Sequence, residues 1–486
     1  MKSSLSDAML DDVSRCIAER MGLYFPRSKW RSLEQALGTA AVELGLKNAQ
    51  ECAEWFMSSP LSREHVETLA GYLTIGETYF LRENRCFEIL EHEVIPDMLR
   101  AKKGHEQRLR IWSAGCATGE EPYSIAIMLH RMGDLLPGYD LSILATDINP
   151  HALRKARAGV YSEWAFRTAP PWFKENFFRQ AGDKQYELLP HIKNMVTFSF
   201  LNLVEDSYPS LTTGSNALDM IFCRNVLMYF TPELAKKVVA RFKLCLLEGG
   251  WLFVSPCEVS NTFLSGFKPV AFPDATLYRK QGIGEKAESE KGRNGETELV
   301  MNLSPIHRFP ASPVQESSPV QEEVSHYQQA LALYERGAYS EAAAMAASHL
   351  SRESNDTQAL ALLCRIYANE GKLDDALRAS DQALAADKLS AGLHYLRAVI
   401  LQEQGMNDEA AASLKKALYL DQDLVLAHFT LATLEQRKGK VKESQRHFNN
   451  ALSLLDRYRP DEIIPESDGM FAGRLKEIIR TTSARM

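Results

Sequence analysis

Residues 109–124, which read LRIWSAGCATGEEPYS, decide the fold of the central part of this chain. The stretch opens with a short apolar run, which predicts a buried strand. It breaks into small residues between Gly115 and Gly119 and continues as the apolar residues 125–129, which favour a helix. Small residues between a strand and a helix let a ligand approach the backbone, and the helix start offers free N–H groups. The stretch therefore predicts a nucleotide-binding α/β unit.

Two acids at the start of this helix bear on the charge of the ligand. Glu120 and Glu121 follow the turn directly, and the glycine spacing is G-x-x-x-G rather than the G-x-G-x-x-G of dinucleotide-binding proteins. Acids are favourable at a helix start through the helix dipole alone, so capping is one interpretation. They would also repel a pyrophosphate and attract a cation, which favours a ligand such as S-adenosylmethionine over NAD.

Composition and charge argue against several classes of protein. The chain has 486 residues, enough for roughly three domains, and its net charge of −7 does not indicate nucleic-acid binding. The eight cysteines form no C-x-x-C pair or Cys/His cluster, so we expect free thiols in a reducing compartment and no metal site. Because the N-terminus lacks an apolar signal core and no stretch approaches a membrane span, we expect a cytoplasmic protein without direct membrane insertion.

Changes in composition divide the chain into parts. We expect a helical domain (1–75), a connector helix (76–105), an α/β domain (106–280) with an inserted subdomain at about 160–195, a linker (281–322), a repeat region (323–456) and a tail (457–486). The linker is rich in Glu, Ser, Gly and Pro, which predicts disorder. The tail is polar and indicates no element. No residue of the helical domain, taken alone, indicates chemistry.

The α/β domain repeats the alternation of strand and helix. Apolar runs predict strands over residues 109–112, 141–145, 196–200, 218–223 and 251–254. A helix over residues 234–247, ended by Gly249 and Gly250, leads to the last strand. This alternation predicts a mostly parallel, doubly wound sheet of the Rossmann type. Such sheets bind ligands at the carboxyl ends of their strands, and polar residues follow several of these runs.

Asp147 ends the second of these runs. An acid some 20 to 30 residues beyond a glycine turn, at the tip of the second strand, is placed to accept hydrogen bonds from a ribose diol. It could instead cap the helix that starts near Pro150. The sequence leaves both interpretations open.

The C-terminal region has a period of 34 residues. Gly337, Gly371, Gly405 and Gly439 share one phase, and small residues recur at three others, with His349 as the exception. Glycine between two helices and small residues where helices cross are the signature of tetratricopeptide repeats, although the proline expected after each second helix is missing. The region therefore predicts an all-α solenoid whose concave surface takes a protein or peptide partner, for docking or regulation.

Five motifs taken together resemble those of the CheR family. They are GETYFLR (76–82), WSAGCATGEEPYS (112–124), ATDIN (145–149), FLNL (200–203) and IFCRNVLMYF (221–230). The resemblance covers about residues 5–280, in the same order. CheR proteins are S-adenosylmethionine-dependent methyltransferases that esterify glutamates of bacterial chemoreceptors, and some carry a C-terminal tetratricopeptide array. The resemblance implies the same protein-glutamate O-methyltransferase activity, with S-adenosylhomocysteine as product and the receptor's cytoplasmic helical bundle as substrate.

The resemblance also implies roles for single residues. The implied catalytic or substrate-facing residues are Arg82, Arg224 and Tyr229. The implied cofactor-binding residues are Thr78, Arg82, Gly115, Glu121, Asp147, Asn202, Leu203, Asn225 and Val226, with Glu120 as second choice to Glu121.

The sequence departs from the family at three places. Gly76 stands where the family often has Asn, and the second N-terminal helix has arginine or lysine only at its start. Residues 255–258, which read SPCE, replace a histidine-containing segment. A methyltransferase for another substrate and a signalling scaffold that binds the cofactor without activity are therefore kept as alternatives.

Overall fold

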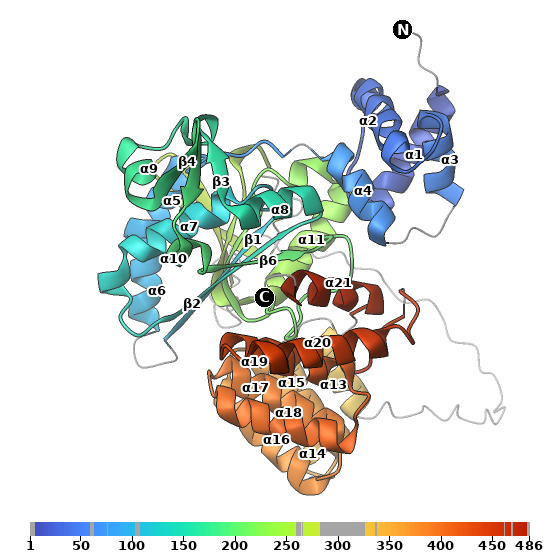
Figure 1. Ribbon diagram of the computed structural model, residues 1–486. Helices are drawn as coiled ribbons and strands as arrows, with labels where there is room; N and C mark the ends of the chain where they lie inside the picture. Colours follow the sequence, from blue (N-terminus) through green and yellow to red (C-terminus); the bar gives the residue numbers. More distant parts are fainter. Residues whose placement is uncertain are drawn as a thin grey trace, which may run out of the picture.

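The computed structural model describes residues 5–58, 63–74, 76–102, 107–258, 264, 266–281, 326–335, 338–460, 462–467 and 470–483. It contains a group of N-terminal helices, an α/β domain and a C-terminal array of helices (Figure 1). The linker predicted over residues 281–322 lies, apart from residue 281, outside the described residues. None of the helices within these ranges has the length and apolar character needed to cross a membrane.

The N-terminal helices form a small domain with its own apolar core. Their bounds are α1 Asp7–Met21, η1 Arg27–Lys29, α2 Trp30–Glu43, α3 Ala49–Ser58 and α4 Arg63–Leu73. Ser6 caps α1 by accepting the N–H of Met9, and Gly22 ends it in the left-handed conformation, at φ 79°. Ile17, Leu37 and Phe56 are fully buried between the helices. The predicted all-helical fold of this part is confirmed.

The α/β domain is built on a seven-stranded sheet in the order β6-β2-β1-β7-β8-β10-β9. Its elements are β1 Arg108–Ala114, α7 Glu120–Arg131, η3 Gly133–Leu135, β2 Asp140–Asp147, α8 Pro150–Ala158, β6 Val196–Phe200, β7 Leu218–Phe222, η5 Leu227–Tyr229, α11 Pro232–Cys245, β8 Leu246–Phe253, η6 Pro256–Glu258, β9 Phe267–Phe272 and β10 Ala275–Lys280. The first five strands in the sheet order are parallel, which confirms the predicted doubly wound sheet. The antiparallel pair β10 and β9, which the sequence analysis does not predict, extends one edge.

The helix predicted to end at Gly249 and Gly250 ends earlier. Helix α11 stops at Cys245, and both glycines lie inside β8. The register between β7 and β8 shifts there, since Leu218 pairs with Leu246 whereas Met220 pairs with Trp251. Gly249 takes a positive φ of 77°, as expected at such an irregularity. Leu246 and Leu247 continue the apolar pattern of the helix, and the predicted helix is therefore too long by two residues.

A connector and an inserted subdomain cover one side of the sheet. The connector comprises α5 Asn84–Ile89, η2 Leu90–Val94 and α6 Ile95–Ala101. The subdomain comprises β3 Val160–Ser162, η4 Glu163–Phe166, α9 Pro171–Phe177, β4 Phe178–Gly182, β5 Gln185–Leu188 and α10 Pro190–Lys193. Phe80, just before the connector, is fully buried against Tyr161, Phe166 and Phe178 of the subdomain. These contacts fix the position of residues 78–82.

The C-terminal region is a stack of four helix pairs. They are α13 His326–Glu335 with α14 Tyr339–Leu350, α15 Thr357–Asn369 with α16 Leu373–Ala386, α17 Ala391–Glu403 with α18 Asn407–Leu420, and α19 Val425–Arg437 with α20 Val441–Leu455. Gly371, Gly405 and Gly439 separate the helices of a pair at φ 73° to 77°, whereas Gly337 lies outside the described residues. The small residues predicted at the helix crossings, such as Ala376 and Ala410, are fully buried. The predicted repeat fold is confirmed.

The tail from residue 457, for which the sequence indicates no element, contains a further helix. This helix, α21 Ala472–Ser483, packs against the last repeat. Leu475 and Ile479 are fully buried in the apolar core of the array. The tail has too few apolar residues among its polar ones to show a clear helical periodicity in the sequence.

Candidate functional site

A cavity of about 310 Å³ lies between the carboxyl ends of β1, β2, β6 and β7 and the N-terminal helices. Every residue for which the resemblance implies a first-choice role lines it: Thr78, Arg82, Gly115, Glu121, Asp147, Asn202, Leu203, Arg224, Asn225, Val226 and Tyr229. Glu120 points elsewhere, because it is buried and accepts a hydrogen bond from the Thr118 hydroxyl at 2.6 Å. Residues spread over some 150 positions of the sequence therefore converge on one pocket.

Glycine is required at the turn after β1. Gly115 has a φ of 85°, and a Cβ on it would lie 2.3 Å from Cγ2 of Val226. The N–H groups of Gly115 and Cys116 both donate to the carbonyl of Thr146, at 2.7 and 2.9 Å, which ties the turn to β2. The bare backbone of this turn forms part of the cavity wall.

The carboxylate of Asp147 holds the same turn. Its Oδ2 accepts the N–H of Ala117 and its Oδ1 accepts the N–H of Asn149, each at 2.8 Å. Burial raises the pKa of Asp147, although these backbone N–H groups act in the opposite direction. The helix cap is Asn149, whose Oδ1 accepts the N–H groups of His151 and Ala152, so capping of α8 by Asp147 is wrong. A carboxylate offers about four acceptor positions, so Asp147 has capacity for a ligand.

The guanidinium of Arg224 is enclosed by protein groups. Its Nη1 lies 3.2 Å from Oε2 of Glu121, and its Nη2 lies 3.0 Å from Oε2 of Glu83. Nη2 also donates to the carbonyl of Arg82 at 2.5 Å, and the side chain is 2% exposed. Arg224 lines the cavity, so its implied role toward the substrate stays a prediction; two carboxylates and the carbonyl of Arg82 hold its guanidinium in place.

The pKa values of Glu121 and Glu83 are shifted in opposite directions, although both carboxylates contact Arg224. Burial raises the pKa of Glu121, opposed by Arg224 and by the Ser113 hydroxyl, which donates at 2.7 Å. For Glu83, burial is outweighed by Arg224 and by the Ser255 hydroxyl, which donates at 2.6 Å, and its pKa is lowered. Glu121 is the carboxylate of this pair that lines the cavity.

The backbone around Arg82 is strained. Leu81 and Glu83 have φ values of 57° and 56°, a conformation that non-glycine residues seldom adopt. Such strain persists where the surrounding structure enforces it, and it is typical of functional sites. The Arg82 guanidinium donates to the carbonyl of Glu77 at 2.7 Å and lies 5.7 Å from the ring of Tyr79. No carboxylate of the described residues forms an ion pair with it.

Glu258 holds the loop that carries Asn225 and Tyr229. It is 4% exposed; its Oε2 accepts the N–H groups of Asn225 and Ser255, at 2.7 and 3.0 Å, and its Oε1 accepts that of Met228 at 3.2 Å. Asn225 has a φ of 59° and donates from Nδ2 to the Ser255 hydroxyl. Residues 255–258 depart from the family pattern, and the sequence gives no sign of a role for Glu258, since its partners are backbone groups.

Glu258→Gln is expected to lower the rate of the methyl transfer that the resemblance implies roughly tenfold, with a modest effect on thermal stability. A glutamine amide presents an NH₂ group to the backbone N–H groups that the carboxylate accepts, and a hydrogen bond to a charged group contributes about 1.5–3 kcal/mol. Initial rates against donor concentration measure the effect. Glu233→Gln, at an exposed position of α11, is the control and should match the unmodified chain. An unchanged rate in Glu258→Gln would remove the proposed positioning role.

The N-terminal helices close the cavity from above, although their sequence alone indicates no chemistry. Asn202 is 2% exposed and donates from Nδ2 to the carbonyl of Arg20 at 2.8 Å, so its side chain secures the end of α1. The N–H of Tyr24 donates to the carbonyl of Tyr229 at 2.8 Å, and Lys29 Nζ lies 5.6 Å from the Tyr229 ring. Burial raises the pKa of Tyr229, which keeps its hydroxyl protonated at neutral pH.

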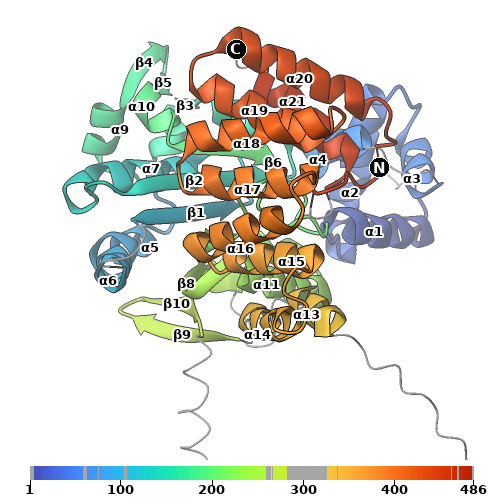
Figure 2. The same cartoon turned by 90° about the horizontal axis from the view of Figure 1, so that it is seen from below.

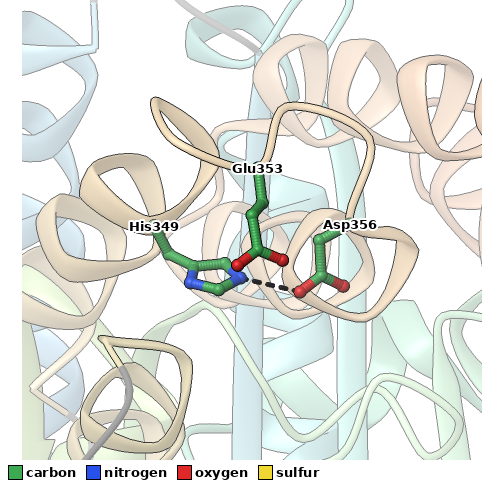
Figure 3. Close-up of side chains that lie close together, drawn as sticks. All are labelled: His349, Glu353 and Asp356. Carbon is green, nitrogen blue, oxygen red and sulfur yellow. Dashed lines mark hydrogen bonds and ion pairs between the residues drawn. The ribbon is translucent and has the colours of Figure 1, made fainter. Parts of the chain in front are cut away.

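A cluster with metal-ligating residue types lies where the first helix pair of the array meets the second (Figure 3). One possible ligand atom from each of His349, Glu353 and Asp356 lies within 4.8 Å of the others. His349 Nε2 is 2.7 Å from Oδ2 of Asp356, whose Oδ1 accepts the N–H groups of Gln358 and Ala359 as the N-cap of α15. Asp356 therefore has a structural role at the start of α15, with one carboxylate oxygen on the helix end and the other on His349.

Comparison with known proteins gives one consistent result. The family model described as "CheR methyltransferase, SAM binding domain" matches residues 76–272. The "Probable chemotaxis protein methyltransferase" of Rhizobium etli is 34% identical over 273 residues, which cover 55% of this chain and 98% of the relative. The "Chemotaxis protein methyltransferase 2" of Vibrio cholerae is 31% identical and covers 57% of this chain and 93% of the relative.

One relative matches most of the chain, including the array. The "Probable biofilm formation methyltransferase WspC" of Pseudomonas aeruginosa is 28% identical over 448 residues, which cover 90% of this chain and 97% of the relative. Among solved structures, MamA from Desulfovibrio magneticus RS-1 covers 27% of the chain at 22% identity, and its TM-score of 0.26 is too low to carry an argument.

Proposed function

This chain belongs to the CheR family of S-adenosylmethionine-dependent methyltransferases, and we propose that its acceptor is a glutamate side chain in the cytoplasmic helical bundle of a chemoreceptor. The products are a glutamyl γ-methyl ester and S-adenosylhomocysteine. Relatives named as chemotaxis protein methyltransferases support this substrate class. The observation that carries the proposal is Arg82, a cation that lines the cavity and forms no ion pair with a carboxylate of the described residues.

The cavity wall fits S-adenosylmethionine, which supplies a methyl group on a positively charged sulfur. Glu121 and Asp147, together with Glu77, line the cavity, and its glycine turn has no room for a Cβ. We assign Asp147 to the ribose hydroxyls and Glu121 to the positively charged methionine part. Leu203 and Val226 provide apolar walls, and Thr78 and Asn225 add polar groups at the rim.

The acceptor chemistry explains why the site needs no general base. A glutamate carboxylate is ionised near neutral pH and attacks the methyl carbon directly. The protein then has to hold the acceptor carboxylate in line with the bond between the methyl carbon and sulfur, and to exclude water from the carboxylate. Arg82 orients the carboxylate through charge-assisted hydrogen bonds. Tyr229 completes the wall next to Arg82, and the N-terminal helices shield the pocket.

The site of action and the partners follow from the same proposal. A chemoreceptor presents its helical bundle to the cytoplasm, so the enzyme acts there. The whole-length match to WspC includes the repeats, and we infer that the array serves signalling rather than the chemistry itself. A receptor that controls surface-associated growth is therefore a substrate to test beside one that controls swimming.

Methyl-labelled S-adenosylmethionine tests the acceptor. After incubation of the full chain with soluble receptor fragments, alkali is expected to release the label as methanol, because carboxyl methyl esters are hydrolysed by base. Fragments with the candidate glutamates replaced by alanine are the control and should take up no label. Label that resists alkali, or that appears on nucleic acid or a small molecule, would contradict the proposal and favour a different methyltransferase. Absence of any transfer would favour the inactive scaffold.

A further inference from the structure

The concave side of the repeat array faces the α/β domain. In Figure 1 the first helices of the pairs, α15, α17 and α19, lie toward the sheet, while α14, α16 and α18 lie on the far side; seen from below, the array overlaps the α/β domain (Figure 2). A cavity of about 650 Å³ has walls from both parts: residues of β1, β2, β6 and α8 line one side, and residues of α17 and α19 line the other. Arg108 and Arg110, which line this cavity, lie at the amino end of β1, whereas Gly115 of the ligand pocket follows the carboxyl end of the same strand.

A buried ion triad joins the two parts. Glu403, the last residue of α17, has its Oε2 2.7 Å from Nη1 of Arg110 and 3.0 Å from Nη2 of Arg108. Arg108 and Arg110 are two residues apart on β1, so they project from the same side of the strand. The three side chains are 8% to 19% exposed. A charge buried to this extent is strongly destabilising without its partners, so the triad favours the docked arrangement.

The connection between β6 and β7 also contacts the array and the ion triad. Leu211 is 7% exposed and belongs to the apolar cluster of the array rather than to that of the sheet. Gly214 accepts a hydrogen bond from Nη2 of Arg110 at 3.0 Å, and Asn216 donates to the carbonyl of Ala368 at 3.5 Å. The same connection begins at Asn202 and Leu203, which line the ligand pocket.

The C-terminal helix fills more of the same concave side. Ile478 and Thr482 of α21 line the shared cavity, and Gln436 of α19 donates to the carbonyl of Thr482 at 3.4 Å. Two segments of this chain, α21 and the amino edge of the sheet, thus lie where an array of this type offers a groove to a peptide.

We propose that the concave face of the repeat array is the docking surface for this chain's own catalytic domain. Charge complementarity between Glu403 and the two arginines, and the insertion of Leu211, identify the occupant. While the domain is docked, a peptide partner is excluded from the groove. A protein that recognises the array binds its outer helices or displaces the catalytic domain.

Small-angle X-ray scattering of the full chain tests this docking. Glu403→Arg places a third positive charge against Arg108 and Arg110, and the radius of gyration is expected to increase as the two parts separate. Glu409→Arg, an equal charge change at an exposed position of α18, should leave the radius of gyration unchanged. Equal values for Glu403→Arg and the unmodified chain, or an equal increase in Glu409→Arg, would overturn the proposal.

A rescue variant separates undocking from damage to the array. Proteins in which apolar residues of similar volume replace a buried ion triad keep their association. The variant Arg108→Met/Arg110→Met/Glu403→Met is therefore expected to have the radius of gyration of the unmodified chain. A larger radius of gyration in this triple variant than in the unmodified chain would overturn the proposal. Since the readout is shape, it is independent of the proposed function. S-adenosylhomocysteine binding to the unmodified chain, measured on the same preparation, reports separately on the pocket.

Discussion

Arg82→Ala is expected to reduce turnover by about 100-fold or more, with only a modest loss of affinity for S-adenosylhomocysteine. In-line transfer requires the carboxylate to be held close to the methyl group, and small misplacements of reacting groups cost about 100-fold. Arg82 is available for this task because its guanidinium bonds to the carbonyl of Glu77 and not to a carboxylate of the described residues. The strained residues on both sides of it fix its direction.

Initial rates with a receptor fragment, together with calorimetric titration of S-adenosylhomocysteine, measure the two effects separately. Arg85→Ala is the matched control, since Arg85 lies three residues away, is exposed and pairs with Glu88 at 2.9 Å. It should retain normal turnover. Full turnover in Arg82→Ala would refute the role of Arg82, whereas a loss of affinity as large as the loss of rate would assign it to binding instead.

Asp147→Ala is expected to weaken S-adenosylhomocysteine binding roughly tenfold to a hundredfold. Hydrogen bonds to a charged acceptor contribute about 1.5–3 kcal/mol, and each 1.4 kcal/mol is a factor of ten in affinity. The substitution also frees the N–H of Ala117, which Asp147 holds at 2.8 Å. Calorimetric titration measures the dissociation constant, and Asp183→Ala, in the exposed turn between β4 and β5, is the control. An unaltered constant in Asp147→Ala would limit Asp147 to a structural role.

The pH dependence of binding gives a second readout of Asp147. Burial raises its pKa, so it takes up a proton at a higher pH than an ordinary aspartate does. The neutral form is a weaker acceptor, and affinity for S-adenosylhomocysteine should therefore fall as the pH is lowered through that raised pKa. Asp147→Ala should lack this component of the pH dependence, whereas Asp183→Ala should retain it.

The positions of several site residues were predictable because these residues follow strand ends, whereas Thr78 and Arg82, which precede the sheet, came only from the resemblance. The apolar runs before Asp147, Asn202 and Arg224 are short and clear, and parallel strands bring their carboxyl ends to one edge. Gly115 was predictable for the same reason, since a strand that turns directly into a helix leaves little room for a side chain. The sequence alone left two interpretations of Asp147 open, and the bonds of Asn149 decide against capping.

The contacts of these residues were not predictable, because they depend on partners far away in the chain. Arg224 pairs with Glu83, 141 positions earlier, and the resemblance gave no reason to expect that it is enclosed. Glu258 bonds to backbone groups, which carry no signal in a sequence. The docked face of the array depends on Glu403 and Arg110, 293 positions apart, so no local pattern indicates it.

Titration of the purified full chain with S-adenosylmethionine tests the central claim, that the carboxyl edge of the sheet binds this molecule, most directly. We predict saturable binding of one molecule per chain that S-adenosylhomocysteine competes away and NAD does not. Absence of binding, or equal competition by NAD, would contradict the account.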